Sequence, residues 1–209
     1  MQHSTPIVFV VDDDISVRES LESLIRCEGW KPETFASAQE FLARPRIVAP
    51  SCLILDVALP DLSGLDLQKC IAADRKDMPI IFITGYGDVP MTVKAMKAGA
   101  VEFLMKPFGN EALLSAIRHC IERSHSALRR EAEIGMLRDC HASLTPRERQ
   151  VLVQVVSGLS NKQVGVELGI SEITVKAHRG RVMQKMHADS LPSLVKMAGR
   201  LRLTPQHRA

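Results

Sequence analysis

The segment Ile7-Val8-Phe9-Val10-Val11-Asp12-Asp13-Asp14 places five consecutive apolar residues directly before three carboxylates. An uninterrupted apolar run of this length, rich in β-branched residues, is typical of a strand that is buried on both faces of a parallel sheet. In open α/β sheets, binding groups lie in the loops just beyond the carboxyl ends of the strands. The segment therefore predicts a buried parallel strand that ends in an acidic site.

Similar apolar runs recur along the first 120 residues and alternate with stretches of helical periodicity. The strand candidates are Cys52–Leu55, Ile80–Thr84 and Val101–Met105, with a weaker one at Glu33–Phe35. The helical stretches are Val17–Cys27, Ala38–Ala43, Leu65–Ala73, Val89–Ala98 and a long one that starts near Asn110. Alternation of this kind predicts the α/β class: a five-stranded parallel sheet of flavodoxin-like order, covered by helices on both faces.

From Leu144 onward the sequence has no strand signal, and helix-start motifs repeat. Thr145-Pro146-Arg147-Glu148 and Ser160-Asn161-Lys162-Gln163 each have the residue pattern of a capping box. Further candidate N-caps are Ser171 for a third helix and Asp189 or Ser190 for a fourth. We therefore predict an α/β domain at residues 1–120, a helical linker at 121–143 and an all-α four-helix domain at 144–209.

Charge divides unevenly between the two halves of the chain. Residues 143–209 hold 11 of the 27 Lys and Arg residues and 4 of the 24 Asp and Glu residues, a net charge of +7. The remaining residues hold 16 and 20, a net charge of −4. Such asymmetry favours a polyanion as the partner of the C-terminal half, although charge alone leaves open a merely solvated basic surface.

The sequence also argues against several classes of protein. The residues before Ile7 lack a basic start, and the first apolar run ends after Val11, so we expect neither a signal peptide nor a membrane span. The five cysteines are odd in number and widely spaced, which favours neither disulfides nor zinc. We expect a cytoplasmic globular protein without a membrane partner.

Residues whose side chains could bind a metal ion or take part in a reaction fall at the predicted strand ends. Asp12 and Asp13 follow the first strand, Asp56 ends the third, Thr84 ends the fourth and Lys106 follows the fifth. These ends meet at one edge of a parallel sheet, where crowded carboxylates repel one another unless a cation compensates. Mg²⁺ is suited to such oxygens, with Mn²⁺ or Ca²⁺ as substitutes. With a metal ion and the lysine in place, Asp56 would attack a phosphoryl group and form an aspartyl phosphate.

Four motifs together resemble the receiver domain of two-component response regulators over about residues 7–125. They are Val11-Asp12-Asp13-Asp14, Asp56 with Pro60 four residues on, Thr84-Gly85, and Lys106-Pro107-Phe108. The resemblance implies that Asp56 accepts a phosphoryl group from a sensor histidine kinase. It implies that Asp12, Asp13 and Asp56 hold Mg²⁺ together with the backbone carbonyl of Ala58. It further implies a switch pair, Thr84 and Phe103, and a cis peptide bond between Lys106 and Pro107.

An enzymatic alternative shares the aspartyl phosphate intermediate. Phosphatases that form this intermediate usually carry a second acid two residues after the nucleophile, but this chain has Ala58 there. We therefore expect a regulator and not an enzyme.

Residues 144–203 resemble the helix-turn-helix output domain of the NarL/FixJ (LuxR-type) regulators. The motifs are Leu144-Thr145-Pro146-Arg147-Glu148, Leu168-Gly169-Ile170-Ser171, and Thr174-Val175 with His178, Val182, Lys185 and Met186. The segments Ser63-Gly64, Gly85–Pro90 and Lys97–Ala100 are most similar to the FixJ branch. This resemblance implies binding of double-stranded promoter DNA. The alternative is an output domain that binds a protein or RNA.

Helical geometry separates the two faces of the expected recognition helix. At about 100° per residue, Val175, Val182 and Met186 fall in one narrow sector, which we assign to the core. The opposite sector holds Ile173, Ala177, Gly180, Arg181 and Gln184, flanked by Lys176. A mid-helix glycine costs roughly 1 kcal/mol relative to alanine, so Ala177 and Gly180 on an exposed face favour the close approach of a DNA major groove.

The candidate DNA contacts follow from this face. Lys176 would donate to guanine acceptors and Ala177 would touch a thymine methyl group. Lys162, Arg181 and Lys185 are better placed to contact phosphates, which position the helix without reading sequence. The predicted set of DNA-binding residues is Lys162, Lys176, Ala177, His178, Gly180, Arg181 and Lys185.

The combined prediction is a DNA-binding transcriptional regulator that phosphorylation activates. Pairing of two copies, through the surface around the fourth helix and fifth strand, would place two output domains on neighbouring half-sites. An apolar stripe of Leu114, Ile117, Ile121 and Leu128 would transmit this change or act as a spacer. The alternative for Leu114 and Ile117 is packing against the sheet of their own domain.

Overall fold

The structure, a computed structural model, describes residues 5–72, 74–85 and 89–203. The chain forms two compact units, Met1–Arg129 and Arg130–Ala209, which we describe one at a time as the N-terminal and C-terminal units. Four residues of the motifs and stretches named above lie outside the described residues: Ala73, Tyr86, Gly87 and Asp88.

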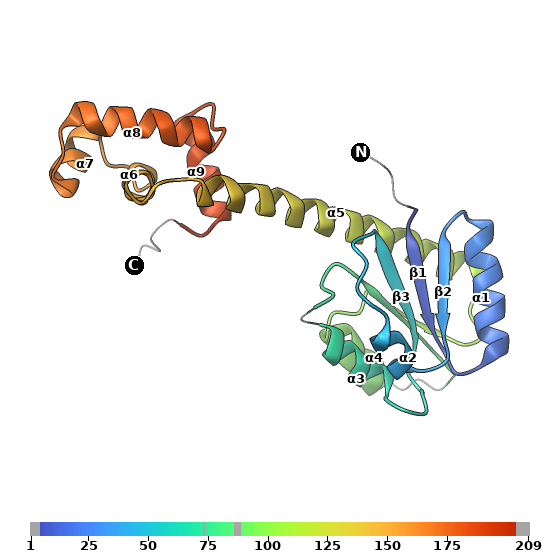
Figure 1. Ribbon diagram of the computed structural model, residues 1–209. Coiled ribbons are helices and arrows are strands. Elements are labelled where there is room, and N and C mark those ends of the chain that lie inside the picture. Colours follow the sequence, from blue (N-terminus) through green and yellow to red (C-terminus); the bar gives the residue numbers. More distant parts are fainter. Residues whose placement is uncertain (1–4, 73, 86–88, 204–209) are drawn as a thin grey trace. The chain divides into compact units, whose positions relative to one another are not determined.

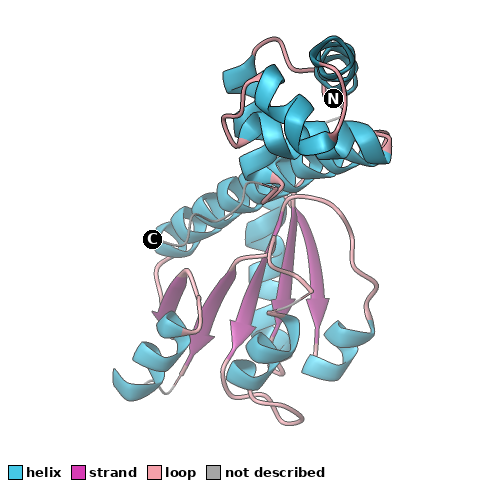
Figure 2. Cartoon of the chain, turned by 90° about the vertical axis from the view of Figure 1, so that its left-hand side faces the viewer, coloured by secondary structure: helices cyan, strands magenta, loops and turns pink. Residues whose placement is uncertain are grey.

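The N-terminal unit contains a five-stranded parallel sheet in the order β2-β1-β3-β4-β5 (Figures 1 and 2). The strands are β1 (Ile7–Val11), β2 (Lys31–Phe35), β3 (Ser51–Asp56), β4 (Ile80–Thr84) and β5 (Glu102–Met105). Every residue of β1, β3 and β4 is buried, as expected for strands covered on both faces. The predicted fold class is confirmed.

Helices cover both faces of this sheet. On one face, α2 (Ala38–Ala43), α3 (Gly64–Ile71) and α4 (Val89–Lys97) enclose a core that includes Phe9, Phe41 and Leu67. On the other face, α1 (Ile15–Cys27) and α5 (Asn110–Ala142) enclose a core that includes Ile25 and Ile54. The backbone follows the predicted flavodoxin-like arrangement.

Helix α5 begins in the N-terminal unit and ends in the C-terminal unit. Leu114 and Ile117 are buried in the core beneath α1 and α5, and Ile121 is partly buried against it. Leu114 and Ile117 therefore pack against the sheet of their own unit, which is the alternative role considered for these two residues. Ser124 is fully buried, and its Oγ accepts a hydrogen bond from the Ser51 backbone N–H at 3.0 Å.

The C-terminal part of α5 packs within the C-terminal unit. Arg200 donates to Glu133 at 2.7 Å, and Cys140 packs on the core that contains Leu144 and Leu152. Within the described residues, no helix, α5 included, combines the length and the apolar character required to span a membrane.

In its described residues, the C-terminal unit adds four helices: α6 (Pro146–Val156), α7 (Asn161–Leu168), α8 (Glu172–Lys185) and α9 (Leu191–Arg200). Thr145 and Ser160 form the two predicted capping boxes, and Ser171 caps α8. Of the two candidates for the last helix, Ser190 is the N-cap. The all-α prediction for this half is confirmed.

The turn between α7 and α8 requires two glycines. Gly169 ends α7 with φ at 64°, in the left-handed region that side chains disfavour. A Cβ atom on Gly165 would lie 2.8 Å from the Ile170 carbonyl oxygen. The close approach of α7 to the turn fixes where α8 begins. Val175 and Val182 are buried, as predicted for the face of α8 that packs on the core.

Candidate functional site

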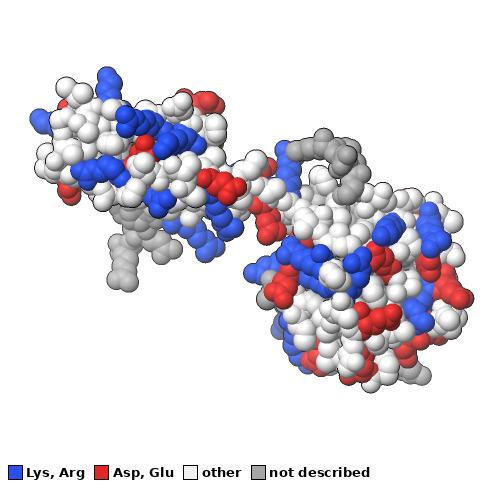
Figure 3. Space-filling model, in the orientation of Figure 1, with Lys and Arg blue, Asp and Glu red and all other residues white. Residues whose placement is uncertain are grey.

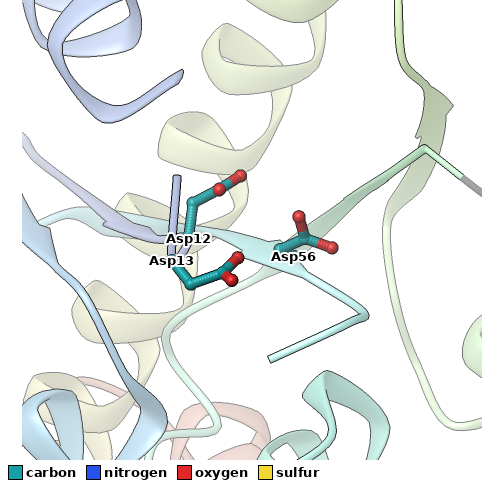
Figure 4. Close-up of side chains that lie close together, drawn as sticks. All are labelled: Asp12, Asp13 and Asp56. Atoms are coloured by element: carbon teal, nitrogen blue, oxygen red, sulfur yellow. The ribbon is translucent and has the colours of Figure 1, made fainter. Parts of the chain in front are cut away.

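Three carboxylates converge at the carboxyl edge of the sheet. Parallel pairing places Val11 beside Leu55, so Asp12 and Asp13 follow β1 where Asp56 ends β3. Oxygens of these three side chains lie within 4.8 Å of one another, and Figure 4 shows Asp12 and Asp13 extending toward the side on which Asp56 lies. Asp12 and Asp56 are buried, whereas Asp13 is exposed.

Lys106 links the two buried carboxylates. Its Nζ donates to Asp12 Oδ2 at 2.6 Å and to Asp56 Oδ2 at 2.7 Å. The Lys106–Pro107 peptide bond is cis, as the receiver resemblance implies, and the Lys106 N–H donates to the Thr84 carbonyl oxygen at 2.7 Å. The lysine thus enters the acidic site from the loop after β5.

The pKa values in this site reflect a competition between burial and ion pairing. Burial raises the pKa of Asp12, and the hydrogen bond from Lys106 only partly offsets that effect. Burial alone would lower the pKa of Lys106, but its hydrogen bonds to Asp12 and Asp56 outweigh it and raise the pKa. Lys106 therefore remains a positively charged ammonium group at neutral pH.

The oxygen set fits a divalent cation. Three aspartate side chains lie beside one ammonium group, and carboxylate oxygens are the ligands that hard divalent ions prefer. The Ala58 N–H donates to Asp56 Oδ1 at 2.9 Å, which places Ala58 directly beside the candidate acceptor.

Two residues support this site in ways that were not predicted from the sequence. Arg18, on α1, donates from one guanidinium nitrogen to the Asp12 carbonyl at 2.7 Å and to the Asp13 carbonyl at 2.9 Å. Gly64 lies so close to Asp56 that a Cβ atom would collide with the Asp56 carbonyl oxygen. The spacing of Arg18, one turn into the helix after the aspartates, was the available signal.

The predicted switch residues lie on the two strands beside the acidic site. Thr84 is buried at the end of β4. Phe103 is partly buried on β5, with its ring centroid 6.2 Å from that of Phe82. A Cβ atom on Gly85 would meet open space, so that glycine is not required for packing. The switch role of Thr84 and Phe103 stays a prediction.

The exposed face of α8 presents most of the predicted DNA contacts. Lys176, Ala177, Gly180 and Arg181 are all exposed, and a Cβ atom on Gly180 would meet open space. Lys162 is exposed on α7. In Figure 3, Lys and Arg side chains gather over the part of the C-terminal unit where α8 lies in Figure 1.

Two further members of the predicted set contact the domain itself. Lys185 Nζ donates to Glu148 Oε2 at 2.7 Å and to the Ser143 carbonyl at 3.1 Å. His178 is partly buried, and its Nδ1 is a buried atom without a hydrogen-bond partner in the described part of the chain. Lys185 would have to leave these partners to contact DNA, and both contacts stay predictions.

Glu148 has a structural role beyond the capping box predicted for it. Hydrogen bonds from Lys185 and from the Thr145 N–H lower the pKa of this buried carboxyl to about 2. The ion pair joins the first turn of α6 to the last turn of α8 and thereby holds the exposed helix in place. Sequence periodicity indicates the angle of Lys185 on its helix but not its partner on α6.

Known families match both units. Residues 8–118 match the response regulator receiver domain, and residues 142–198 match the bacterial regulatory proteins of the luxR family. The first match contains all four residues of the acidic site, and the second contains α6, α7 and α8. The receiver domain implies a histidine kinase as a partner, and the helix-turn-helix domain implies DNA binding.

Relatives match both units in a single chain. Nodulation protein W of Bradyrhizobium diazoefficiens is 49% identical over 96% of this chain and 88% of its own length. The transcriptional regulatory protein FixJ of the same organism is 41% identical, over 92% and 94%. The solved structure of response regulator StyR is 47% identical and has a TM-score of 0.83, covering 94% of this chain and all of its own.

The acidic site, the helix-turn-helix and these matches agree. The chain belongs to the two-component response regulators that join a receiver domain to a LuxR-type DNA-binding domain, a family of transcriptional regulators and not of enzymes.

Proposed function

We propose that Asp56 accepts a phosphoryl group from a sensor histidine kinase. The observation that carries this proposal is the position of Asp56 between Lys106 and the Ala58 N–H, beside two further aspartates. One carboxylate oxygen forms a bond to phosphorus while the bond between phosphorus and the kinase imidazole breaks. Lys106 stabilises the negative charge on the phosphoryl oxygens.

The proposed metal is Mg²⁺, for which Mn²⁺ or Ca²⁺ can substitute. Asp12, Asp13 and Asp56 would hold it together with the Ala58 carbonyl, and Arg18 keeps the backbone of both N-terminal aspartates in place. When bound, a divalent ion supplies positive charge to the transferring phosphoryl group.

Labelling with a small phosphodonor tests the acceptor. Incubation with acetyl phosphate and Mg²⁺ is expected to modify Asp56 alone, and Asp56→Asn to abolish labelling. Asp74→Asn is the matched control because Asp74 is an exposed carboxylate that follows α3, away from the carboxyl ends of the strands. Labelling of the Asp56→Asn variant at the wild-type stoichiometry would mean that another residue is the acceptor.

The proposed partner of the C-terminal unit is double-stranded promoter DNA, read by α8. Lys176 and Ala177 contact base edges, Gly180 permits close approach, and Lys162 and Arg181 contact phosphates. Because bacterial DNA lies in the cytoplasm, the proposal also places the protein there. An output domain specialised for protein or RNA is the competing possibility.

Paired substitutions separate base reading from phosphate contact. Lys176→Ala is expected to relax base preference at one or two positions, whereas Arg181→Ala should weaken binding to all duplexes and flatten the salt dependence. Equal effects of both variants on every duplex would show that neither residue reads bases. If the affinity of the wild-type protein for duplex DNA does not fall as the salt concentration rises, the protein or RNA alternative is favoured.

Phosphorylation is proposed to produce a homodimer. The supporting observation is that four large apolar side chains of α4 and β5 are exposed, and we call them the patch on α4 and β5: Val89 (76% exposed), Val93 (44%), Met96 (41%) and Met105 (49%). Phosphoryl oxygens on Asp56 would draw the Thr84 hydroxyl toward them, and Phe103 would turn into the space vacated. That turn reshapes β5, the strand on which part of the patch lies.

A further inference from the structure

The N-terminal turn of α8 carries a large apolar side chain that the domain does not cover. Ile173 is 82% exposed, the largest fraction among the exposed large hydrophobic residues that the structure describes. It lies two residues after the N-cap, Ser171, in the turn that begins the helix. Isolated exposed apolar residues are ordinary on protein surfaces, so its meaning depends on what surrounds it.

Ile173 lies in the middle of the exposed stripe of α8. At about 100° per residue, Val182 is about 180° away from it and is buried. Gly180 and Ala177 lie within about 20° and 40° of it, on either side, and both are exposed. The isoleucine therefore faces the same partner as the two small residues that permit close approach.

The surroundings of Ile173 favour DNA over an apolar protein surface. The same helix face carries Lys176 and Arg181, so exposed cations flank the isoleucine on its own helix, and the exposed Lys162 lies on the preceding helix, α7. A protein partner would need a broader apolar patch, whereas Ala177 and Gly180 add little apolar area. Phosphates match the cations, and a duplex also offers isolated apolar groups.

The chemistry of the major groove identifies the group that Ile173 would meet. Residues in the N-terminal part of a recognition helix contact base edges. The apolar group on those edges is the C5 methyl of thymine. We propose that Ile173 reads a thymine methyl group and so determines part of the promoter sequence that this protein recognises. This inference rests on the proposed binding of duplex DNA by α8.

Replacement of thymine by deoxyuridine tests the contact because it removes only the methyl group. Duplexes are first selected from a random library by the wild-type protein, and single thymines of the selected site are then replaced one at a time. Loss of a buried methyl group at about 0.8 kcal/mol corresponds to a roughly fourfold weaker affinity. Wild type is expected to show this loss at one thymine of each half-site, and Ile173→Ala to bind both versions of that duplex equally.

The matched control is Val166→Ala, which removes another highly exposed apolar side chain (79%) from α7. This variant is expected to keep the wild-type difference between thymine and deoxyuridine at the same position. Persistence of that difference in Ile173→Ala, or its absence at every thymine in wild type, would overturn the inference while leaving DNA binding intact. Failure of the wild-type protein to bind any duplex would overturn the DNA-binding proposal and this inference together.

Discussion

At the scale of single residues, the acidic site depends on groups with different tasks. Lys106 forms ion pairs with the two buried carboxylates, Asp12 and Asp56, whereas Asp13 is exposed and forms no ion pair within the described residues. Asp13 can therefore bind a metal ion without losing an ion pair, unlike Asp12 and Asp56. Arg18 contributes no ligand but fixes the backbone from which Asp12 and Asp13 extend.

Asp13→Ala is expected to lose most of the affinity for Mg²⁺, because the ion is held by few protein oxygens and one of them is removed. Calorimetric titration of the full chain with MgCl₂ measures this, with Asp74→Ala as the control. An unchanged titration curve for Asp13→Ala would place the ion elsewhere.

Arg18→Met is expected to weaken Mg²⁺ binding by about tenfold, because the loss of a charge-assisted hydrogen bond of roughly 1.5 kcal/mol frees the backbone that carries Asp12 and Asp13. The same titration gives the result. Affinity equal to that of the wild type would show that the backbone conformation is set without Arg18.

At the scale of elements, the sequence predicts the strands whose residues are all buried. It does not predict features that depend on contact with another element. The apolar runs of β1, β3 and β4 predict these strands because burial on both faces excludes polar residues. Strand β2 gave a weaker signal because it is an edge strand, where Lys31 and Pro32 are tolerated. The contact of Lys185 is not predictable from the sequence, since it depends on Glu148 of another helix.

The ion pair between Glu148 on α6 and Lys185 on α8 makes the free energy of unfolding of the C-terminal unit depend on pH. Glu148 has a pKa of about 2 in the folded chain, below its ordinary value of 4.5, so its contribution is complete above about pH 5 and is lost as the pH falls toward 2. Glu148→Gln is expected to destabilise the C-terminal unit by about 1–3 kcal/mol at neutral pH and to flatten this acid dependence.

Urea unfolding of the full chain, followed by circular dichroism between pH 3 and 7, measures this effect. The single tryptophan, Trp30, packs in the N-terminal unit, so its fluorescence reports that unit separately and serves as the internal control. Equal acid dependence of the wild type and Glu148→Gln would contradict a role for this carboxylate.

At the scale of the whole molecule, phosphorylation is expected to shift monomers to dimers. Val93→Glu places a charge in the patch on α4 and β5 and should prevent dimerisation of the phosphorylated protein. Val48→Glu is the control because Val48 is more exposed than Val93 (76% against 44%) but precedes β3, away from this patch. Sedimentation would measure the mass in each state. Monomers in both states, with tighter DNA binding after phosphorylation, would instead indicate release of a masked recognition helix.

The central claim is that the chemical state of Asp56 controls DNA binding by α8. Fluorescence anisotropy of a labelled duplex, selected from a random library, gives the affinity of the full chain with and without acetyl phosphate and Mg²⁺. The account predicts that acetyl phosphate tightens wild-type binding by a factor in the range of about 5 to 150 and leaves Asp56→Asn unchanged. Equal wild-type affinity in both conditions, or the same tightening in Asp56→Asn, would contradict it.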